Sequence, residues 1–415
     1  MNFYVQEENI IATDLNLSNS FKSSSKEEAL NTRGKIFFLA EKNPKYFRRC
    51  FLMDSSSSLP YDKEDLNVLR TNSMLNSDYS YFNKLIEEKT VVFLNSAYNN
   101  WTDLLNKKQI NRKWKVNVIG LGDVGGTLVT GLRLMGGDVL SSIGIYDKDE
   151  SKVNRWYFES NAILDINFPD APFVFPLEEK DLFNCDMFIF CVSVGVPKVG
   201  KEHKDVRLAQ LEGNSKIVSY YAKLARKNNF KGVFSVVSDP VDLLCKVAFN
   251  ESNKDDKDEF DFNGLGSDQI RGYGLGVMNG RAAFYAKEKD ILKNYNEEGR
   301  AFGPHGEGLI IVNSVENYDE NISNLLTDLT KKANLDVRKT GFKPYIAPAL
   351  SSGSLSILAT IRGQWHYSTN FLGGTFMGSK NKYGLYGAEF ETYNFNETLF
   401  NKLKNTYDYL NSIYF

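Results

Sequence analysis

The chain has 415 residues, of which 42% are hydrophobic and 25% are charged, with 50 basic side chains against 52 acidic ones. This length and composition are typical of a globular protein with two packed domains and an extension. With this near-neutral charge balance, the chain lacks the basic surplus that a nucleic-acid-binding protein normally carries. No nucleic-acid partner is therefore expected.

The cysteines and the N-terminus carry no sign of a metal site, a membrane or secretion. Cys50, Cys185, Cys191 and Cys245 form no CxxC or other metal-ligand spacing. The first residues, MNFYVQEENIIATD, lack the basic region and apolar run of a secretory signal. No stretch reaches the roughly 18 uninterrupted apolar residues that a spanning helix needs. We therefore expect a cytoplasmic protein with no metal and no membrane partner.

Along the chain, the pattern of residues changes once. Residues 1–112 are polar and rich in serine and asparagine, with apolar runs at 36–40 and 91–94, and are interpreted as an N-terminal extension with a few strands. From Lys115, short β-branched runs alternate with amphipathic stretches, which predicts βαβ units and a parallel sheet. The runs are Val116–Ile119, Ile143–Tyr146, Phe173–Phe175, Met187–Val192 and Val233–Val237. The sequence thus predicts an α/β fold.

Three glycines follow the first of these runs. The segment KVNVIGLGDVGGTLVTGLRLMGG places Gly120, Gly122 and Gly125 directly after a predicted strand and at the start of a predicted helix. In this context the first glycine permits a tight turn, the second lets the backbone approach a pyrophosphate and the third allows close helix–strand packing. The helix N-terminus would supply N–H donors to the phosphates.

Asp147 ends the next predicted strand, SSIGIYD. There a carboxylate can accept hydrogen bonds from the adenosine ribose hydroxyls, and its charge would repel a 2′-phosphate. We therefore predict a doubly wound parallel sheet of the Rossmann type over residues 113–270, with NAD preferred to NADP. A charged stretch at 250–263 is predicted to be a surface loop, and a second domain is predicted over 271–415, ending in a helix over 397–414.

Further motifs follow in a familiar order. They are DMFIFCVSVGVPK, RLAQLEGN, VVSDPVDLL, FGPHGEG and FLGGTFMG. With these motifs, the chain from Lys115 to its end resembles the lactate/malate dehydrogenase family. The resemblance implies an NAD-dependent oxidoreductase that interconverts a small 2-hydroxy acid and a 2-oxo acid, an α+β catalytic domain over 271–415, a homo-oligomer and a cofactor contact at Gly195. Residues 1–112 lie outside the resemblance, and they are expected either to cover a sheet edge or to build a subunit interface.

The chemistry of hydride transfer fits the residues at the matching positions. The alcohol proton needs a base that titrates near neutrality, which favours a histidine. The resemblance gives this role to His305, one of three histidines in the chain. It makes Arg281 the planar clamp for the substrate carboxylate. It makes Arg207 the loop arginine that polarises the substrate carbonyl.

Two positions differ from the family pattern, and a third bears on the substrate. Met278 stands where the family has the aspartate that orients the histidine, and Asp239 replaces the asparagine at the end of a strand. We predict that Asp239 partly replaces the missing carboxylate beside His305. Lys198 stands at the position that sets the substrate class in the family, and a cation there favours a second anionic group on the substrate.

Two other functions stay open at this point. The same cofactor could serve the reduction of an imine or amino-acid-type substrate, because Asp239 tolerates a cationic nitrogen better than an asparagine does. Alternatively, the chain could be a non-catalytic NAD-binding protein, an interpretation that Met278 keeps open.

Overall fold

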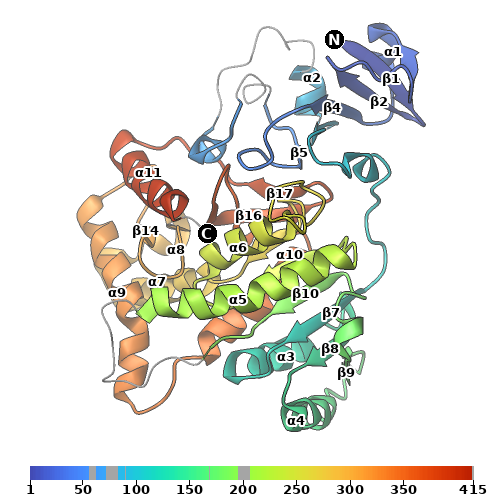
Figure 1. Cartoon of the computed structure of the whole chain (residues 1–415). Coiled ribbons are helices and arrows are strands. Elements are labelled where there is room, and N and C mark those ends of the chain that lie inside the picture. Colours follow the sequence, from blue (N-terminus) through green and yellow to red (C-terminus); the bar gives the residue numbers. More distant parts are fainter. Residues whose placement is uncertain (56–61, 72–82, 89, 168, 195–205, 414–415) are drawn as a thin grey trace.

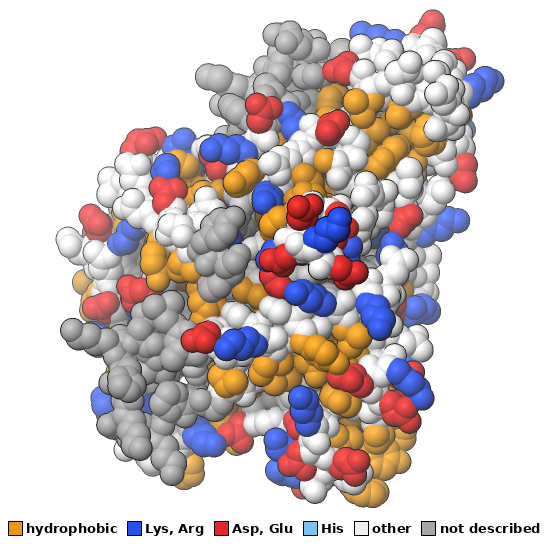
Figure 2. All heavy atoms as spheres, in the orientation of Figure 1, with side chains coloured by type: hydrophobic (Ala, Val, Ile, Leu, Met, Phe, Trp, Pro, Cys, Tyr) orange, Lys and Arg blue, Asp and Glu red, His pale blue; other side chains and the backbone are white. Residues whose placement is uncertain are grey.

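A computed structural model describes residues 1–55, 62–71, 83–88, 90–167, 169–194 and 206–413 of the chain. Within these residues, no helix combines the length and the apolar character needed to cross a membrane. Charged side chains of both signs are interspersed over the face shown in Figure 2.

A nine-stranded sheet forms the centre of the molecule, in the order β17-β16-β15-β12-β11-β10-β7-β8-β9. Six neighbouring strands pair in parallel, and β15, β16 and β17 continue the sheet with antiparallel pairing. The parallel strands are β7 (Trp114–Ile119), β8 (Leu140–Tyr146), β9 (Phe173–Pro176), β10 (Met187–Phe190), β11 (Val233–Val236) and β12 (Ile270–Gly272). Their order from the β9 edge, third-second-first-fourth-fifth-sixth along the chain, is that of the Rossmann fold. The predicted α/β fold class is confirmed.

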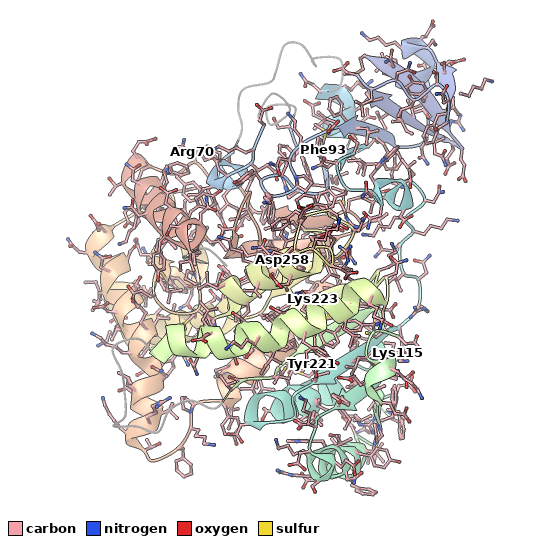
Figure 3. All side chains as sticks on the ribbon, viewed as in Figure 1. Arg70, Phe93, Lys115, Tyr221, Lys223 and Asp258 are labelled. Atoms are coloured by element: carbon pink, nitrogen blue, oxygen red, sulfur yellow. The ribbon has the colours of Figure 1, made fainter. Side chains whose placement is uncertain are left out.

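Helices cover both faces of this sheet (Figure 1). They are α3 (Asp123–Met135), α4 (Glu150–Asn161), α5 (Val206–Lys227) and α6 (Val241–Ser252). Alternate residues of β10 explain the two layers, because successive side chains of a strand point to opposite faces. Phe188 and Phe190 pack in one core with α5 and α6, and Met187 and Ile189 pack in another core with α3. Figure 3 labels Tyr221 of α5, whose ring contacts those of Phe188 and Phe190.

The second half of the chain adds strands to this sheet and builds a helical layer beside it. The added strands are β15 (His366–Phe371), β16 (Phe376–Gly384) and β17 (Gly387–Phe390), while β13 (Arg300–Phe302) and β14 (Ile310–Val312) form a separate hairpin. The main helices are α7 (Leu275–Glu288), α9 (Glu320–Lys339), α10 (Ser356–Ile361) and α11 (Glu397–Ser412). Shorter pieces are η4 (Glu179–Asp181), η5 (Asp290–Leu292), α8 (Tyr295–Glu298) and the π-helical η6 (Pro348–Leu355). The sheet therefore continues across residue 270.

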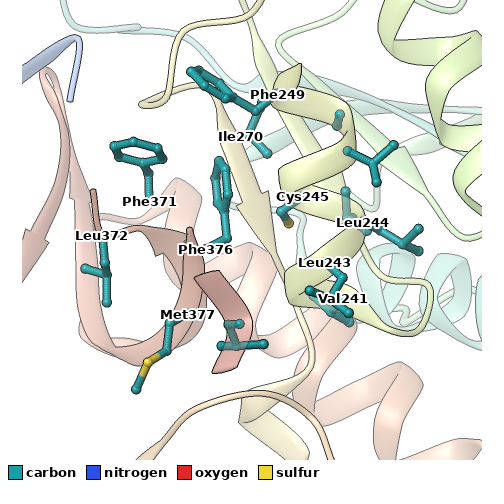
Figure 4. Close-up of a cluster of buried hydrophobic side chains, with 14 of the residues drawn as sticks. Val241, Leu243, Leu244, Cys245, Phe249, Ile270, Phe371, Leu372, Phe376 and Met377 are labelled. Carbon is teal, nitrogen blue, oxygen red and sulfur yellow. The ribbon is translucent and has the colours of Figure 1, made fainter. Parts of the chain in front are cut away.

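The helix α6 joins the two halves. Its apolar side chains Leu244, Cys245 and Phe249 pack against Ile270 of β12 and Phe376 of β16, as Figure 4 shows. All five of these side chains are buried. This packing fixes the start of α6, which follows directly after Asp239 and Pro240.

The N-terminal residues form a second, six-stranded mixed sheet in the order β3-β1-β2-β4-β6-β5. Its strands are β1 (Asn2–Gln6), β2 (Asn9–Thr13), β3 (Lys22–Ser24), β4 (Ile36–Ala40), β5 (Cys50–Leu52) and β6 (Val91–Asn95). Short helices connect them: α1 (Lys26–Asn31), η1 (Leu66–Leu69), α2 (Asn83–Glu87) and η3 (Trp101–Leu104). The two apolar runs noted in the sequence are β4 and the first four residues of β6.

The N-terminal sheet packs beside β17, the edge strand of the central sheet (Figure 1). Arg49 is 4% exposed, and its Nε lies 2.7 Å from Oδ1 of Asp268, a residue that precedes β12. Nζ of Lys107 lies 3.6 Å from Oδ2 of the same carboxylate. Burial raises the pKa of Asp268, but the charges of Arg49 and Lys107 outweigh burial and lower it to about 2. Of the two roles considered for residues 1–112, the described contacts support covering a sheet edge.

Candidate active site

A cavity of about 560 Å³ opens where the parallel strands end, at the point between β7 and β10 where the strand order reverses. Open α/β sheets bind their ligands at this point. Gly120 and Gly122 lie in the turn from β7 to α3 and Gly125 lies in the first turn of α3, as the sequence predicted. Gly120 has φ of +86°, a conformation that favours glycine, and a Cβ on Gly125 would lie 1.9 Å from the carbonyl oxygen of Gly120. A Cβ on Gly122 would meet nothing within 4 Å, so the backbone there is open to a ligand.

Asp147 follows β8 and lies against the same turn. Its Oδ2 accepts a 2.7 Å hydrogen bond from the backbone N–H of Leu121, and its Oδ1 accepts one of 3.0 Å from Asp149. Lys152 places Nζ 3.7 Å from Oδ1, and Lys148 also lines the cavity. The carboxylate is thus fixed at the rim of the cavity next to two cations, which sequence reasoning did not single out.

These features fit a dinucleotide such as NAD. The N-terminus of α3 points backbone N–H groups at the open side of Gly122, which suits a pyrophosphate. Asp147 stands where ribose hydroxyls would be recognised. Among the described residues, no group of three or more His, Cys, Asp or Glu side chains is arranged to hold a metal ion.

Asp239 lines this cavity and contacts His305, which does not itself line it. His305 lies in the turn between β13 and β14, and Asp239 lies between β11 and α6. Nδ1 of His305 is 2.9 Å from Oδ1 of Asp239, with 17% of the histidine side chain and 47% of the aspartate side chain exposed. An ionised carboxylate only accepts hydrogen bonds, so Nδ1 carries the hydrogen and Nε2 is left as the nitrogen that can exchange a proton. The contact between these two residues is the one that the sequence led us to expect.

The position that holds the histidine's aspartate partner in the resembling family is occupied here by Met278. Met278 lies in α7, is 3% exposed and packs in an apolar cluster, while the amide of Asn279 accepts a hydrogen bond from Tyr295. Neither side chain supplies a carboxylate to His305. One turn further along α7, the partly buried Arg281 donates to the sulfur of Met278. Burial lowers the pKa of Arg281, and the negative charge of Asp239 acts against that shift, which places the guanidinium in the electrostatic range of the His305–Asp239 pair.

Two residues that sequence reasoning missed hold the pair in place. Asn214 of α5 is fully buried, and its amide donates 2.7 Å to the backbone oxygen of Asp239 and accepts 2.8 Å from the N–H of Val194. Asp242, in the first turn of α6, accepts a 2.9 Å bond from Thr369. Burial raises the pKa of Asp242 to about 7, against the hydrogen bond from Thr369. The segment RLAQLEGN contains Asn214, but nothing in the sequence shows that its amide spans two strand ends.

Three predicted site residues cannot be placed in this geometry. Gly195 and Lys198 lie outside the described residues. Arg207 is in the first turn of α5, but its side chain lies outside the description. His366, by contrast, is a buried residue of β15 whose ring bonds Thr360 and the backbone oxygen of Gln364, so it takes no part in the site.

Comparisons with known proteins agree with this geometry. Residues 114–261 match the family model of the lactate/malate dehydrogenase NAD-binding domain. An L-lactate dehydrogenase of Mycoplasma pneumoniae is 27% identical over 203 residues, covering 48% of this chain and 58% of that protein. A malate dehydrogenase of Aliarcobacter butzleri is 22% identical over 195 residues, covering 47% of this chain and 56% of that protein. The chain thus spans less than two thirds of the length of these relatives.

Solved structures share the fold over a longer region. A minor L-lactate dehydrogenase of Enterococcus mundtii aligns with a TM-score of 0.57 and 18% identity, covering 72% of this chain and 96% of that one. A malate dehydrogenase of Archaeoglobus fulgidus in complex with NADH aligns with a TM-score of 0.54 and 19% identity, covering 71% and 97%. With its glycine turn, its strand order and the match of residues 114–261, the chain carries an NAD-binding domain like that of the lactate/malate dehydrogenase family.

Proposed function

We propose that this protein is an NAD-dependent oxidoreductase that interconverts a small 2-hydroxy acid and the corresponding 2-oxo acid. The observation that carries the proposal is the His305–Asp239 pair, whose Nδ1 and Oδ1 lie 2.9 Å apart and whose aspartate lines the dinucleotide cavity. A histidine oriented by a carboxylate is the arrangement that general acid–base catalysis needs. Its presence also favours an active enzyme over a non-catalytic relative that has lost its acid–base pair.

The residues of the site divide the work of the reaction. Gly120, Gly122 and the N-terminus of α3 would hold the pyrophosphate of NAD, and Asp147 the adenosine ribose. When bound, the nicotinamide supplies the hydride for reduction of the oxo acid or accepts it from the hydroxy acid. His305 would give a proton from Nε2 to the carbonyl oxygen during reduction and take it back during oxidation. Asp239 would stabilise the imidazolium form by its charge.

Arginines would bind the substrate. Arg281 is partly buried, and among the described residues its one recorded hydrogen bond goes to a weak sulfur acceptor. Its guanidinium is therefore suited to a planar, bidentate contact with the substrate carboxylate. By resemblance, Arg207 would polarise the carbonyl, Gly195 would contact the cofactor and Lys198 would face the far end of the substrate.

We also propose a homo-oligomer, because Phe158, Leu164 and Ile166 around the end of α4 are strongly exposed apolar side chains. Light scattering of the purified protein tests this.

The decisive experiment is a panel of 2-oxo acids assayed for NADH oxidation with the wild-type protein and His305→Gln. We expect turnover of at least one acid by the wild-type protein. His305→Gln should lower kcat by about 10²–10⁴-fold, which is the usual contribution of a general acid. NADH should bind both proteins equally well, as measured by fluorescence titration.

Each result has a clear meaning. If no 2-oxo acid is reduced, the proposal fails. If turnover appears only with added amine, the activity is imine reduction, because the Asp239 carboxylate would tolerate a cationic nitrogen. If His305→Gln retains full activity, His305 is not the proton donor.

A further inference from the structure

A second cavity, of about 150 Å³, is lined by His305, and the cavity of the dinucleotide is lined by its partner Asp239. The lining of the second cavity comes from α5, the start of α6, the turn that carries His305 and the end of α11. Pro240 and His305 line this cavity, while the preceding Asp239 lines the larger one. The contact between His305 and Asp239 therefore links the linings of the two cavities. A cavity of roughly 150 Å³ in another protein accommodates benzene, so this one has room for a branched or aromatic side chain.

Apolar side chains make up most of the lining. Leu211 comes from α5, Leu243 from α6, and Leu410 and the ring of Tyr409 from α11. Leu211, Leu243 and Leu410 are buried in the same hydrophobic cluster. Each methylene group that moves from water into such a site stabilises the bound state by roughly 0.8 kcal/mol. The lining thus favours an apolar group over a polar one.

The charged groups of the cavity have the wrong sign for a second carboxylate. Its described acidic residues are Asp242 and Glu307, and no lysine or arginine is among the described residues that line it. Glu307 is already paired with Lys331, with Nζ 3.1 Å from Oε2. Because the raised pKa of Asp242 keeps this group largely protonated below about pH 7, a dicarboxylic substrate would bring its second negative charge mainly against Glu307, with no lysine or arginine in the described lining to offset it.

The wall formed by α11 is held in place. Nζ of Lys246, a buried residue of α6, donates to the backbone oxygens of Asn411 at 3.0 Å and Ile413 at 2.9 Å. The C-terminal end of α11 therefore meets a positive charge, which stabilises a helix at that end. Tyr409 and Leu410 are thereby fixed at the cavity.

From this geometry we infer that the cavity between α5, α6 and α11 is the side-chain subsite of the enzyme, and that its substrate is a 2-oxo acid with a branched aliphatic or aromatic side chain. The inference rests on the proposed function. During reduction the hydride and its electron pair go to C2 of the oxo acid, and the carbonyl oxygen takes the proton of His305. The products are the 2-hydroxy acid and NAD⁺. The apolar side chain of the substrate stays in the cavity and takes no part in the transfer.

Binding without turnover tests the inference most directly. The protein is saturated with NADH and titrated calorimetrically with 2-hydroxy-4-methylpentanoate and with malate, because a reduced cofactor and a reduced acid cannot react. We expect the branched acid to bind at least about tenfold more tightly than malate. Equal or tighter binding of malate, the preference that Lys198 would give, overturns the inference, as does failure of both acids to bind.

A pair of variants ties the preference to the cavity. Tyr409 lines the cavity and Leu335 of α9 does not, yet both are 49% exposed, so each position tolerates a long charged side chain. Tyr409→Arg should weaken binding of the branched acid about tenfold and strengthen binding of malate, because it puts a cation and a hydrated group at an apolar wall. Leu335→Arg should leave both affinities at the wild-type values. An unchanged preference in Tyr409→Arg contradicts the assignment.

The panel of oxo acids separates this inference from the proposed function. We expect 4-methyl-2-oxopentanoate and phenylpyruvate to have kcat/KM values at least about tenfold above that of oxaloacetate. A preference for oxaloacetate would overturn the subsite and leave the proposed function intact. Absence of any NADH oxidation would overturn the proposed function, while the binding preference would still decide whether the cavity receives an apolar group.

Discussion

At the scale of single residues, the site keeps a carboxylate beside the histidine but brings it from another element. The side chain of Met278 fills an apolar core position on α7, so no acid can stand there without being buried among hydrophobic residues. The side chain of Asp239, which follows β11, is 47% exposed, so its carboxylate keeps access to water. Both substitutions can be recognised in the sequence, because the positions of Met278 and Asp239 can be counted from the motifs that surround them. The contact between Asp239 and His305 follows from the convergence of strand ends at one edge of the sheet.

The cofactor preference depends on the charge balance at the rim of the dinucleotide cavity. Asp147→Ser should reduce the ratio of the NADP and NAD dissociation constants by about tenfold or more, because it removes the carboxylate that would face a 2′-phosphate. Lys152→Ala should increase that ratio, because Lys152 stands 3.7 Å from Asp147 and offsets its charge. Titration of NADH and NADPH fluorescence measures both effects. Tighter binding of NADPH than of NADH by the wild-type protein would contradict this role of Asp147.

Asp242 should make the stability of the protein depend on pH. Burial raises its pKa from 3.8 to about 7, so the folded protein keeps a proton that the unfolded chain releases. The stability that this group contributes is complete below about pH 4 and is lost as the pH rises to about 7. Between those pH values, the unfolding free energy of Asp242→Asn should therefore rise by roughly 2–4 kcal/mol relative to that of the wild-type protein. The basis is about 1.36 kcal/mol for each unit of pKa shift. Urea unfolding at several pH values measures this difference. If the unfolding free energies of the wild-type protein and Asp242→Asn depend on pH in the same way, Asp242 is charged in the folded state.

At the scale of elements, α11 depends on a side chain from a different helix. Lys246→Met keeps the apolar stem of Lys246 but leaves the last backbone oxygens of α11 without their donor, which should cost about 1–3 kcal/mol of unfolding free energy. Lys404→Met on α11 is the matched control. Lys404 is exposed and pairs only with Asp408 one turn away, so its loss should cost less than about 0.5 kcal/mol. Equal losses in the two variants, measured by urea unfolding, would remove the special role of Lys246.

Five of the six parallel strands could be predicted because each contains an apolar run, while the short β12, with the sequence IRG, has no such run. The antiparallel strands β15 and β16 could not be assigned to the same sheet, because they contain polar residues such as Ser368, Asn370, Ser379 and Asn381. These side chains are buried. Ser368 and Asn381 form hydrogen bonds with one another and with Nη2 of Arg271, a network that no local pattern reveals. The N-terminal sheet likewise combines parallel and antiparallel pairs, some of them between strands far apart in the sequence.

At the scale of the whole molecule, a buried ion pair links the N-terminal sheet to the central one. Arg49→Ala leaves Asp268 buried with only Lys107 beside it, and should cost about 3–5 kcal/mol of stability near neutral pH. Because the pKa of Asp268 is lowered to about 2, the contribution of the pair is present above about pH 4 and is lost as the pH falls toward 2. The unfolding free energies of the wild-type protein and Arg49→Ala should therefore converge as the pH falls toward 2.

An exposed ion pair provides the comparison. Arg155 and Glu159 lie on the surface of α4, 3.5 Å apart and each 62% exposed, so Arg155→Ala should change the unfolding free energy by about 0.5 kcal/mol or less. If Arg49→Ala behaves like Arg155→Ala in urea unfolding, the pair does not hold the two sheets together.

The central claim is that Asp239 serves His305 in proton transfer, and the pH dependence of kcat/KM for 2-oxo acid reduction by Asp239→Asn tests it most directly. An amide leaves the shape of the site nearly unchanged but removes the charge that stabilises the imidazolium form. The account predicts a loss of about 10²-fold or more near neutral pH, with activity falling at a lower pH than in the wild-type protein as the proton donor is lost. A variant whose profile coincides with that of the wild-type protein, or whose rate is higher, would contradict the account.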